Sequence, residues 1–436
     1  MASRVKQKIG LITATSLVVG NMIGSGIFVL PPTLAKYGSV SLLGWIFTAA
    51  GALVLAKIFS NLSKLISAKS GGPYIFAKEG FGDFIGFLVA WGYWISTWVV
   101  NAGIAVAIIS ALTIFFPQLE SNSLLSVAIG LAFIWFFTWI NLNGLKLSGK
   151  FQVVTTILKI APLLLVIVLG VFYFDIENFP KFNSSEQSDF GAFSAVATLT
   201  LFAFLGIESA TIPAENIHEP ENTVPKATMI GTTITALIYI LGTAVLFGIL
   251  PIDELKTSPA PFAEAGKIIG GEYTGYFIAA GAAISAIGAL NGWILIVGQL
   301  PMATAKDKMF PKIFRKQNKN EAPYLGLIIG GVLSSVIMFM NYTEGLVDQF
   351  EFIALLTTLT ALIPYLFVAA AYTIIAINKK VFIGNKLKIV LLSVLGFAYA
   401  FWAIYGSGSN TVFYGLLLLL AGIPFYIIMK YNQKRS

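Results

Sequence analysis

Two ionisable residues, Lys159 and Glu208, lie in the middle of long apolar stretches of the sequence. A charged side chain at the centre of a bilayer costs at least about 2.5–3.5 kcal/mol, so each should face a partner, a cavity or a transport pathway. A buried carboxylate can balance a positive charge on a bound molecule or carry a proton, and a buried ammonium can act as a fixed cation. Both residues are therefore functional candidates, although each could simply be neutralised inside the protein or pair with the other.

Other reactive side chains are scarce. The chain has no cysteine and one histidine, His218, which lies in a polar stretch beside acidic residues. This composition excludes disulfides and thiolate metal sites and disfavours a Ser-His-Asp triad, so no metal or cofactor is expected. Catalysis needs a positioned acid–base pair or nucleophile, and the apolar segments supply only the two buried charges. The sequence therefore argues against an enzyme.

Two glycine-containing motifs interrupt apolar segments, GNMIGSGIF at 20–28 and FLGIESA at 204–210. Glycine destabilises a helix by about 1 kcal/mol relative to alanine, and Asn and Ser compete for backbone hydrogen bonds. We therefore expect both stretches to be unwound, although single glycines in membrane helices more often mark close packing. Unwound backbone offers N–H groups to a carboxylate and carbonyl groups to an ammonium. Together these groups match the head group of an α-amino acid.

The segments that carry these residues are almost entirely apolar. Hydrophobic residues make up 57% of the 436 residues and charged residues 11%, whereas soluble domains contain about 25% charged residues. Runs of about 20 apolar residues can each cross a hydrocarbon core of about 30 Å as a helix. The sequence therefore predicts an all-α membrane protein. Twelve transmembrane helices are expected, at 10–33, 40–66, 82–112, 121–142, 149–174, 192–215, 226–250, 274–305, 322–341, 348–376, 386–407 and 409–430.

Basic residues are distributed unequally between the two sides of these spans. With the N-terminus in the cytoplasm, 23 of the 28 Lys and Arg residues fall on the cytoplasmic side, four fall on the opposite side, and the last is Lys159. The positive-inside rule therefore predicts a multi-pass protein of the cell membrane with both termini in the cytoplasm. The net charge of +8 reflects this orientation, and no nucleic-acid partner is expected.

The two interruptions fall at equivalent places in the first and sixth spans. This spacing is typical of secondary transporters built from an inverted repeat. It predicts a transporter core at 1–376, with repeat one at about 10–174 and repeat two at about 192–376, followed by helices 11 and 12 and a tail at 377–436. Non-helical backbone at this depth is tolerated only around a cavity or inside protein, so the site should lie in the middle of the membrane.

Over essentially the whole chain, the sequence resembles the amino acid–polyamine–organocation (APC) superfamily. Beyond the two glycine motifs, the segments that resemble its bacterial basic amino acid/polyamine antiporters, the arginine/agmatine antiporter type above all, are GGPY at 71–74, PENTVP at 220–225, GW at 292–293 and IPY at 363–365. The resemblance implies a LeuT-type five-plus-five inverted repeat with unwound helices 1 and 6, and amino acid exchange by alternating access. It is also compatible with a homodimer.

The same resemblance implies which residues bind the head group. The amides of Ser25 and Gly26 would hold the carboxylate, and carbonyl groups near Ile23, Phe202 and Leu205 would accept from the ammonium. Phe202 stands where the arginine/agmatine antiporters carry a tryptophan that closes the site from outside. Phe202 therefore provides an aromatic side chain at this place but lacks the indole N–H.

Further residues are implied for the substrate side chain and the gates. Trp293 matches a residue that stacks on the substrate, where cation–π attraction contributes about 0.5–2 kcal/mol, with a core or lipid-facing tryptophan as the alternative. Tyr93, Thr97, Asn101 and Thr357 fall at pocket positions, with ordinary helix packing as the alternative for each. The implied gate residues are Tyr74, Tyr93, Phe202, Glu208, Trp293 and Tyr365.

Glu208 and Lys159 point to different substrates. Antiporters of cationic amino acids and polyamines carry glutamate at the position of Glu208, which favours exchange of arginine, lysine or ornithine, also against their amines. Lys159, in LKIAP at 158–162, has no counterpart in the arginine/agmatine antiporter. It resembles a lysine of neutral amino acid exchangers and proton-coupled transporters, whose ammonium occupies the region of a sodium site. The alternative is therefore a neutral or broad-range amino acid exchanger or an H+-coupled, Na+-independent symporter.

Overall fold

The computed structural model describes residues 8–435, apart from 25, 67–68, 114, 259, 341–345 and 407–408. Regular secondary structure in these residues is helical, and β-type pairing is limited to an isolated parallel bridge between Ile9 and Ile217. The α-helices are α1 (Leu11–Met22), α2 (Gly26–Ala35), α3 (Val40–Leu65), α4 (Pro73–Phe81), α5 (Asp83–Leu112), α6 (Gln118–Ser121), α7 (Ser123–Leu142), α8 (Leu145–Gly170), α9 (Asp189–Leu201), α10 (Pro220–Ile249), α11 (Ile252–Leu255), α12 (Pro261–Gly270), α13 (Glu272–Lys306), α14 (Tyr324–Met340), α15 (Leu346–Asn378), α16 (Phe382–Gly406), α17 (Ser409–Leu420) and α18 (Gly422–Arg435). The 3-10 helices are η1 (Val171–Tyr173), η2 (Ile176–Asn178), η3 (Phe202–Phe204), η4 (Ser209–Thr211), η5 (Ala214–Asn216) and η6 (Lys312–Arg315).

Eleven helical segments of the described chain are long and apolar enough to cross a membrane. They are Leu11–Ala35, Val40–Leu65, Asp83–Leu112, Ser123–Leu142, Leu145–Tyr173, Asp189–Thr211, Pro220–Ile249, Glu272–Lys306, Thr360–Asn378, Asn385–Gly406 and Val412–Tyr431. The expected ninth span, 322–341, forms α14, a shorter apolar helix of 17 residues. The protein is therefore an integral membrane protein, and the all-α class is confirmed.

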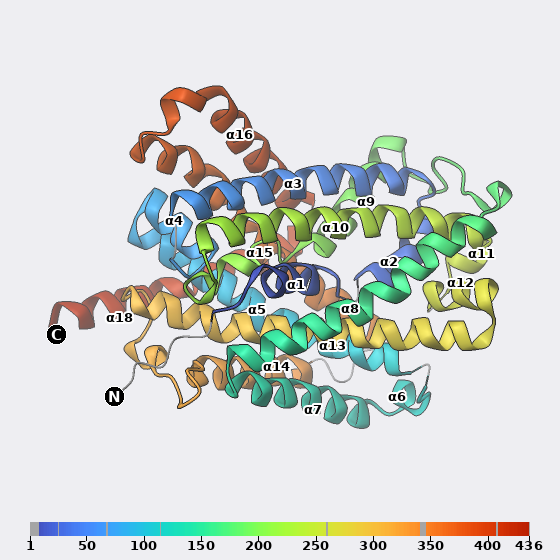
Figure 1. Ribbon diagram of the computed structural model, residues 1–436, viewed down its shortest axis with the longest axis horizontal. Helices are drawn as coiled ribbons and strands as arrows, with labels where there is room; N and C mark the ends of the chain where they lie inside the picture. Colours follow the sequence, from blue (N-terminus) through green and yellow to red (C-terminus); the bar gives the residue numbers. More distant parts are fainter. Residues whose placement is uncertain are drawn as a thin grey trace.

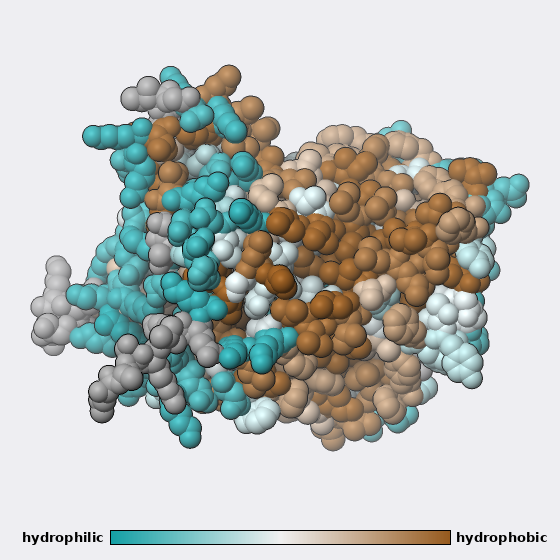
Figure 2. Space-filling view, viewed as in Figure 1, coloured by the Kyte–Doolittle hydropathy of each residue, from teal (hydrophilic) through white to brown (hydrophobic). Residues whose placement is uncertain are grey.

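Most long helices follow the long axis of the molecule, and α3, α10, α8 and α13 lie side by side on the face seen in Figure 1. The helix α5 is buried along most of its length against α13 and α15. Figure 2 shows a broad hydrophobic band across the face in view and hydrophilic residues gathered at the end where α18 finishes. We call this the polar end, and it includes residues 69–83, 212–219 and 306–323.

The first apolar segment consists of two helices, α1 and α2. The helical hydrogen-bond pattern ends at Ile23, whose N–H still donates to the carbonyl of Val19 (2.8 Å) but whose ψ of 85° is not helical. Gly24 then makes a short turn back to the carbonyl of Met22 (2.9 Å), and α2 begins at Gly26. The interruption therefore lies within the glycine motif at 20–28.

The sixth apolar segment leaves helical geometry after η3. Leu205 is extended, with φ −66° and ψ 139°, and Gly206 has a positive φ of 106°. Only short 3-10 turns, η4 and η5, follow before α10. Glycine adopts positive φ without a steric penalty, and a Cβ at position 206 would lie 3.1 Å from the Cβ of Asn21. The two interrupted segments therefore meet at Gly206.

Candidate substrate site

Side chains from neighbouring helices cap the carbonyl groups at the C-terminal end of α1. A helix leaves its last carbonyl groups without intrahelical partners, and buried carbonyl groups must be satisfied elsewhere. Lys159 Nζ donates to the carbonyl oxygens of Gly20 (2.9 Å) and Ile23 (2.5 Å). Ser285 Oγ lies within donating distance of the carbonyl oxygens of Ile23 (3.2 Å) and Gly24 (2.9 Å). The first interruption is therefore held by α8 and α13.

The ammonium of Lys159 is fully satisfied by backbone. The side chain is completely buried, and Nζ also donates to the carbonyl of Ser285 at 3.1 Å. An ammonium has three N–H donors, so the three carbonyl groups match its capacity. A positive charge at a helix C-terminus is also favoured by the helix dipole. Lys159 Nζ thus joins α1 to α13 through backbone carbonyl groups and has no carboxylate partner in the described chain.

Trp293 and Asn21 connect the first interruption to α13 and to the second interruption. The Trp293 indole Nε1–H donates to the carbonyl of Asn21 (3.2 Å), and both residues are buried. The Asn21 side-chain amide donates to Ser209 Oγ (2.9 Å), which lies just beyond the second interruption. The orientation of the indole ring is therefore fixed by α1, and the two interruptions are joined by a side-chain hydrogen bond.

The carboxylate of Glu208 is buried at the second interruption and accepts hydrogen bonds from two tyrosine hydroxyls. These come from Tyr93 on α5 and Tyr365 on α15. The Tyr365 hydroxyl also accepts from the N–H of Gly206 (3.2 Å), so the carboxylate and the interrupted backbone share one partner. Within the described chain Glu208 forms no ion pair, and Lys159 has its own separate acceptors. The two buried charges therefore do not pair with each other.

The residues expected around the amino acid head group lie beside these contacts. Gly26 is buried at the start of α2, and a Cβ there would lie 3.5 Å from the Cβ of Ala203, so α2 packs directly on η3. Leu205 is buried and Phe202 is half-buried at the second interruption. Ser25 lies outside the described residues. The structure thus brings the start of α2 and the second interruption together.

Three further residues that the sequence predicts at the pocket, Thr97, Asn101 and Thr357, are buried but differ in their hydrogen bonds. Thr97 Oγ1 donates to the carbonyl of Trp94 (2.6 Å) in its own helix, so its hydroxyl proton is used. Asn101 Oδ1 and Thr357 Oγ1 are buried and have no hydrogen-bond partner within the described chain. Buried polar atoms are rarely left without a partner. These two atoms therefore have unused capacity to bind a polar ligand, as do other buried atoms of the described chain such as the hydroxyl oxygens of Thr228, Thr235 and Thr243 on α10.

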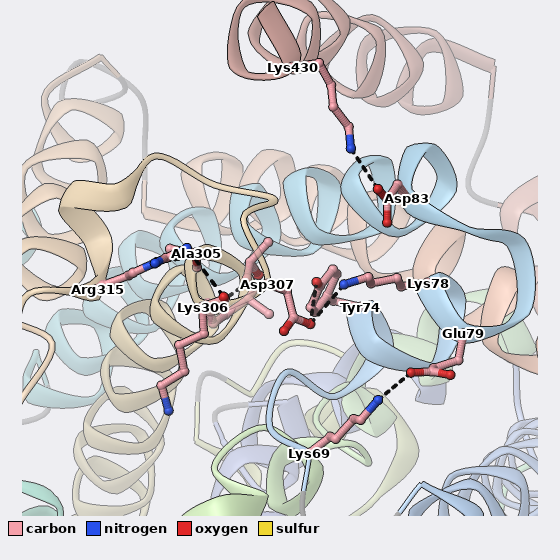
Figure 3. Close-up of polar contacts among 12 residues, drawn as sticks. Lys69, Tyr74, Lys78, Glu79, Asp83, Ala305, Lys306, Asp307, Arg315 and Lys430 are labelled. Carbon is pink, nitrogen blue, oxygen red and sulfur yellow. Dashed lines mark hydrogen bonds and ion pairs between the residues drawn. The ribbon is translucent and has the colours of Figure 1, made fainter. Parts of the chain in front are cut away.

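Tyr74 lies in a separate polar network at the polar end, shown in Figure 3. Its hydroxyl donates to Asp307 Oδ2 (2.9 Å), which also pairs with Lys78 Nζ (3.2 Å). Burial and, second, the negative charge of Asp307 raise the pKa of the Tyr74 hydroxyl, so it stays protonated and acts as the donor. Lys306 Nζ pairs with Glu215 (2.6 Å) close by. This network joins α4, the end of α13 and the loop that follows the second interruption.

Comparison with known proteins identifies the family of the chain. Residues 9–423 match the amino acid permease family. The chain belongs to this family. The permease is 32% identical to the arginine/ornithine antiporter of Pseudomonas aeruginosa, with 99% of this chain and 93% of the relative aligned. It is 32% identical to the putrescine transporter PotE of Escherichia coli (98% and 97% aligned) and 30% identical to the cadaverine/lysine antiporter of E. coli (99% and 96% aligned).

These comparisons confirm the APC resemblance and the expectation of a transporter rather than an enzyme. The family and the three relatives are transport proteins by name. The alignments cover nearly the full length of both partners, so the similarity is not confined to the glycine motifs. It therefore extends over the segments that contain both interruptions, Lys159 and Glu208.

Sequence reasoning missed a buried amide cluster beside α1 in this permease. Asn291 Nδ2 donates to Gln152 Oε1 (3.0 Å), Asn141 Nδ2 donates to Asn291 Oδ1 (3.2 Å), and Gln152 Nε2 donates to the carbonyl of Ser16 (3.4 Å). A signal was present, because the polar residues of α8 recur every three or four residues on one face and lead to Lys159. They are Ser148, Gln152, Thr155, Thr156 and Lys159, all buried.

Sequence reasoning also missed Ser285 and Tyr239, which contact backbone at the interruptions. Each is a single polar residue in an apolar helix, a pattern too common to single out without its contacts. Both serve here as donors to carbonyl groups that helix ends leave open.

Proposed function

We propose that the permease is an antiporter that exchanges cationic amino acids, arginine, lysine or ornithine, with one another or against their amines. The buried carboxylate of Glu208 is the observation that carries this proposal. It has two tyrosine donors and no ion pair within the described chain. A buried carboxylate without a counter-ion is unfavourable in a membrane interior, and a substrate ammonium or guanidinium would supply the missing charge.

The names of the relatives support the same class of substrate. They are transporters of arginine, ornithine, putrescine, cadaverine and lysine, according to their descriptions. Each of these molecules carries a positive charge beyond that of an α-ammonium or is a diamine. An amine without a carboxylate would lose the contacts of the amino acid head group and depend on Trp293 and Glu208.

The head group would bind at the two interruptions. The amide of Gly26 opens α2, and a helix N-terminus favours a carboxylate; the Ser25 amide would complete this contact. Carbonyl groups near Ile23, Phe202 and Leu205 would accept from the α-ammonium. Because the Ile23 carbonyl already accepts from Lys159 (2.5 Å), the substrate would share this acceptor with the lysine.

The substrate side chain would lie among Trp293, Tyr93, Thr97, Asn101 and Thr357. The unpartnered Oδ1 of Asn101 and Oγ1 of Thr357 support this placement, because each could accept from a distal ammonium or guanidinium. Thr97 would contribute its methyl face, since its hydroxyl donates within α5. Trp293 would stack on the cation with a fixed ring, because Asn21 anchors its indole N–H.

Transport would follow alternating access around these residues. The interruptions correspond in this proposal to unwound helices 1 and 6 of a five-plus-five inverted repeat with twelve spans, a core at 1–376 and two further helices at 377–436. Phe202 would close the site on the outer side. Glu208, Tyr93, Tyr365 and Trp293 would gate it centrally, and the Tyr74 network would close the inner side.

The polar end would face the cytoplasm. It includes basic residues that the positive-inside rule assigns to the cytoplasm, among them Lys69, Lys78 and Arg315, and the hydrophilic surface in Figure 2 is consistent with that placement. Both termini would then be cytoplasmic, and the protein would reside in the cell membrane. We also propose that the permease forms a homodimer. Every residue that we place at the site belongs to one chain, so the proposed site does not require the second copy.

Lys159 favours a second candidate function. Its Nζ donates to three carbonyl groups between α1 and α13. Without the lysine, these carbonyl groups would be available as ligands of a bound cation. A lysine in this place is compatible with Na+-independent exchange of neutral amino acids or with H+-coupled symport.

Substrate counterflow in proteoliposomes tests the two candidates. Proteoliposomes that contain the purified permease are loaded with either arginine or alanine, and uptake of labelled arginine, lysine, ornithine, agmatine, putrescine, alanine and leucine is compared at several pH values without Na+. We expect exchange of the cationic substrates and little exchange of alanine or leucine. Exchange of the neutral amino acids without the cationic ones would overturn the first candidate and leave the second.

A further inference from the structure

Two lysines open the outward-facing side of α8. Lys146 and Lys150 lie near the start of this helix, and both are exposed. Residues three or four positions apart are neighbours on the surface of a helix. Val154 and Ile157 continue the same face, with exposed fractions of 55% and 62%. This face of α8 is therefore basic at its start and aliphatic beyond it.

The loop before α14 adds a third lysine close to the start of α8. The side-chain amides of Asn318 (2.7 Å) and Asn320 (3.4 Å) both donate to the carbonyl of Leu142, the last residue of α7. A Cβ at Gly144 would lie 2.9 Å from the carbonyl oxygen of Asn320, so the loop packs on the connection between α7 and α8. Lys319 lies between the two asparagines and is exposed. This contact places the start of α8 at the polar end.

The three lysines have no carboxylate partner within the described chain. Other lysines of the polar end do, and Figure 3 shows the pairs Lys69–Glu79 and Lys78–Asp307. The loop of Lys319 also contains Glu321, which is exposed and forms no ion pair in the described chain. Even with this acid, positive charge is in excess here. The partner that fits such a surface is an anion.

An exposed tryptophan indicates the depth of this surface in the membrane. Trp139 lies near the end of α7 and has an exposed fraction of 58%. The helices α7 and α8 are in contact through the rings of Phe137 and Phe151, whose centroids are 5.2 Å apart. Tryptophan is enriched at the level of the lipid head groups. The lysines therefore lie at head-group level, and Val154 and Ile157 lie deeper, beside the lipid chains.

We propose that Lys146, Lys150, Lys319, Val154 and Ile157 form a binding surface for an anionic phospholipid, which we call the α8 lipid surface. The lysines would contact the phosphate and the charged head group, because basic residues at the membrane surface attract anionic lipids. The aliphatic side chains would contact an acyl chain of the same molecule. The lipid lies outside the two interruptions, so this proposal does not depend on which substrate the permease carries.

A fluorescent label on the α8 lipid surface tests the proposal. The chain has no cysteine, so Ile157→Cys can be labelled specifically with bimane, and Val154→Cys provides a second label on the same face. The protein is reconstituted in vesicles of equal amounts of phosphatidylglycerol and phosphatidylcholine, in which one lipid or the other carries brominated chains that quench the label on contact. We expect a preference for phosphatidylglycerol of at least about threefold at both positions.

A label on α10 is the matched control for position. This helix also presents an outward face with exposed Leu237, but the face begins with a single exposed lysine, Lys226. The preference for phosphatidylglycerol at Leu237→Cys should therefore be clearly smaller than at Ile157→Cys. An equal preference at the two labels would show a diffuse effect of net charge and would overturn the proposal.

Lysine substitutions then test which charges are responsible. Replacing Lys146, Lys150 and Lys319 together by glutamine should abolish the preference at position 157. Replacing three other exposed lysines, Lys64, Lys226 and Lys379, removes the same charge and should leave it unchanged. A preference that survives the first set, or falls equally with both sets, contradicts the proposal.

A single substitution keeps the test decisive if the triple variant does not fold. Lys319→Gln alone should lower the preference at position 157 about twofold, and an unchanged preference overturns the proposal. No step of this experiment measures transport, so its failure and the failure of the proposed function are separate results.

Discussion

At the scale of single residues, the two buried charges are stabilised by different chemistry. Lys159 uses three backbone carbonyl groups, whereas Glu208 uses two tyrosine hydroxyls. Both residues could be found from sequence because charges are rare in these apolar segments. Their partners could not, because Ser285 lies 126 positions from Lys159 and Tyr365 lies 157 positions from Glu208. Such contacts depend on how helices pack and leave no local pattern.

Replacement of Lys159 by alanine should impair both stability and transport. The change removes the side-chain donor to the buried carbonyl of Gly20 in α1, and a buried group left unsatisfied costs about 1–3 kcal/mol. We expect a lower thermal unfolding temperature and at least about fivefold slower exchange, measured on purified protein and in proteoliposomes. Lys150→Ala, an exposed lysine of the same helix, should change neither. An unchanged exchange rate and pH profile in Lys159→Ala would show that the lysine is not needed for turnover.

At the scale of structural elements, glycine identifies where helices are interrupted but not the backbone geometry beyond the interruption. The motifs at 20–28 and 204–210 contain both interruptions. No local pattern predicts that η4 and η5, rather than a regular helix, come after Glu208. Their geometry depends on Gly206, Asn21 and Ser209, which meet only in the folded protein. A helix propensity argument treats each segment alone and cannot include this contact.

The substitution Gly206→Ala should be strongly disruptive. The residue has a φ of 106°, and an added Cβ would lie 3.1 Å from the Cβ of Asn21. A side chain in such a backbone conformation costs about 1–3 kcal/mol before any clash. We expect a lower unfolding temperature and loss of exchange, checked by thermal unfolding and counterflow. Gly10→Ala, where no atom lies within 4 Å of the added Cβ, is the control. Equal behaviour of the two variants would mean that the contact at Gly206 does not matter.

At the scale of the whole molecule, composition was sufficient to predict an all-helical membrane protein. Helix ends were harder to predict, because helices continue past the apolar residues. The fifth expected span begins at 149, whereas α8 begins at Leu145 with Lys146 exposed. Conversely, α14 is shorter than the expected segment at 322–341. The division into two repeats and the orientation in the membrane stay predictions, since they rest on symmetry and charge rather than on contacts.

The central claim is that the buried carboxylate of Glu208 recognises the positive charge of the substrate. The most direct test compares each cationic substrate with a neutral analogue, arginine with the isosteric citrulline and lysine with norleucine, which lacks the terminal ammonium, in wild type and Glu208→Gln proteoliposomes. Glu221→Gln, an exposed glutamate at the start of α10, is the control.

We expect wild type and Glu221→Gln to prefer the cationic member of each pair by at least about tenfold, or roughly 1.4 kcal/mol. In Glu208→Gln the carboxylate charge is lost, so this preference should disappear. A Glu208→Gln permease that keeps the full wild-type preference for arginine over citrulline and for lysine over norleucine would contradict the account.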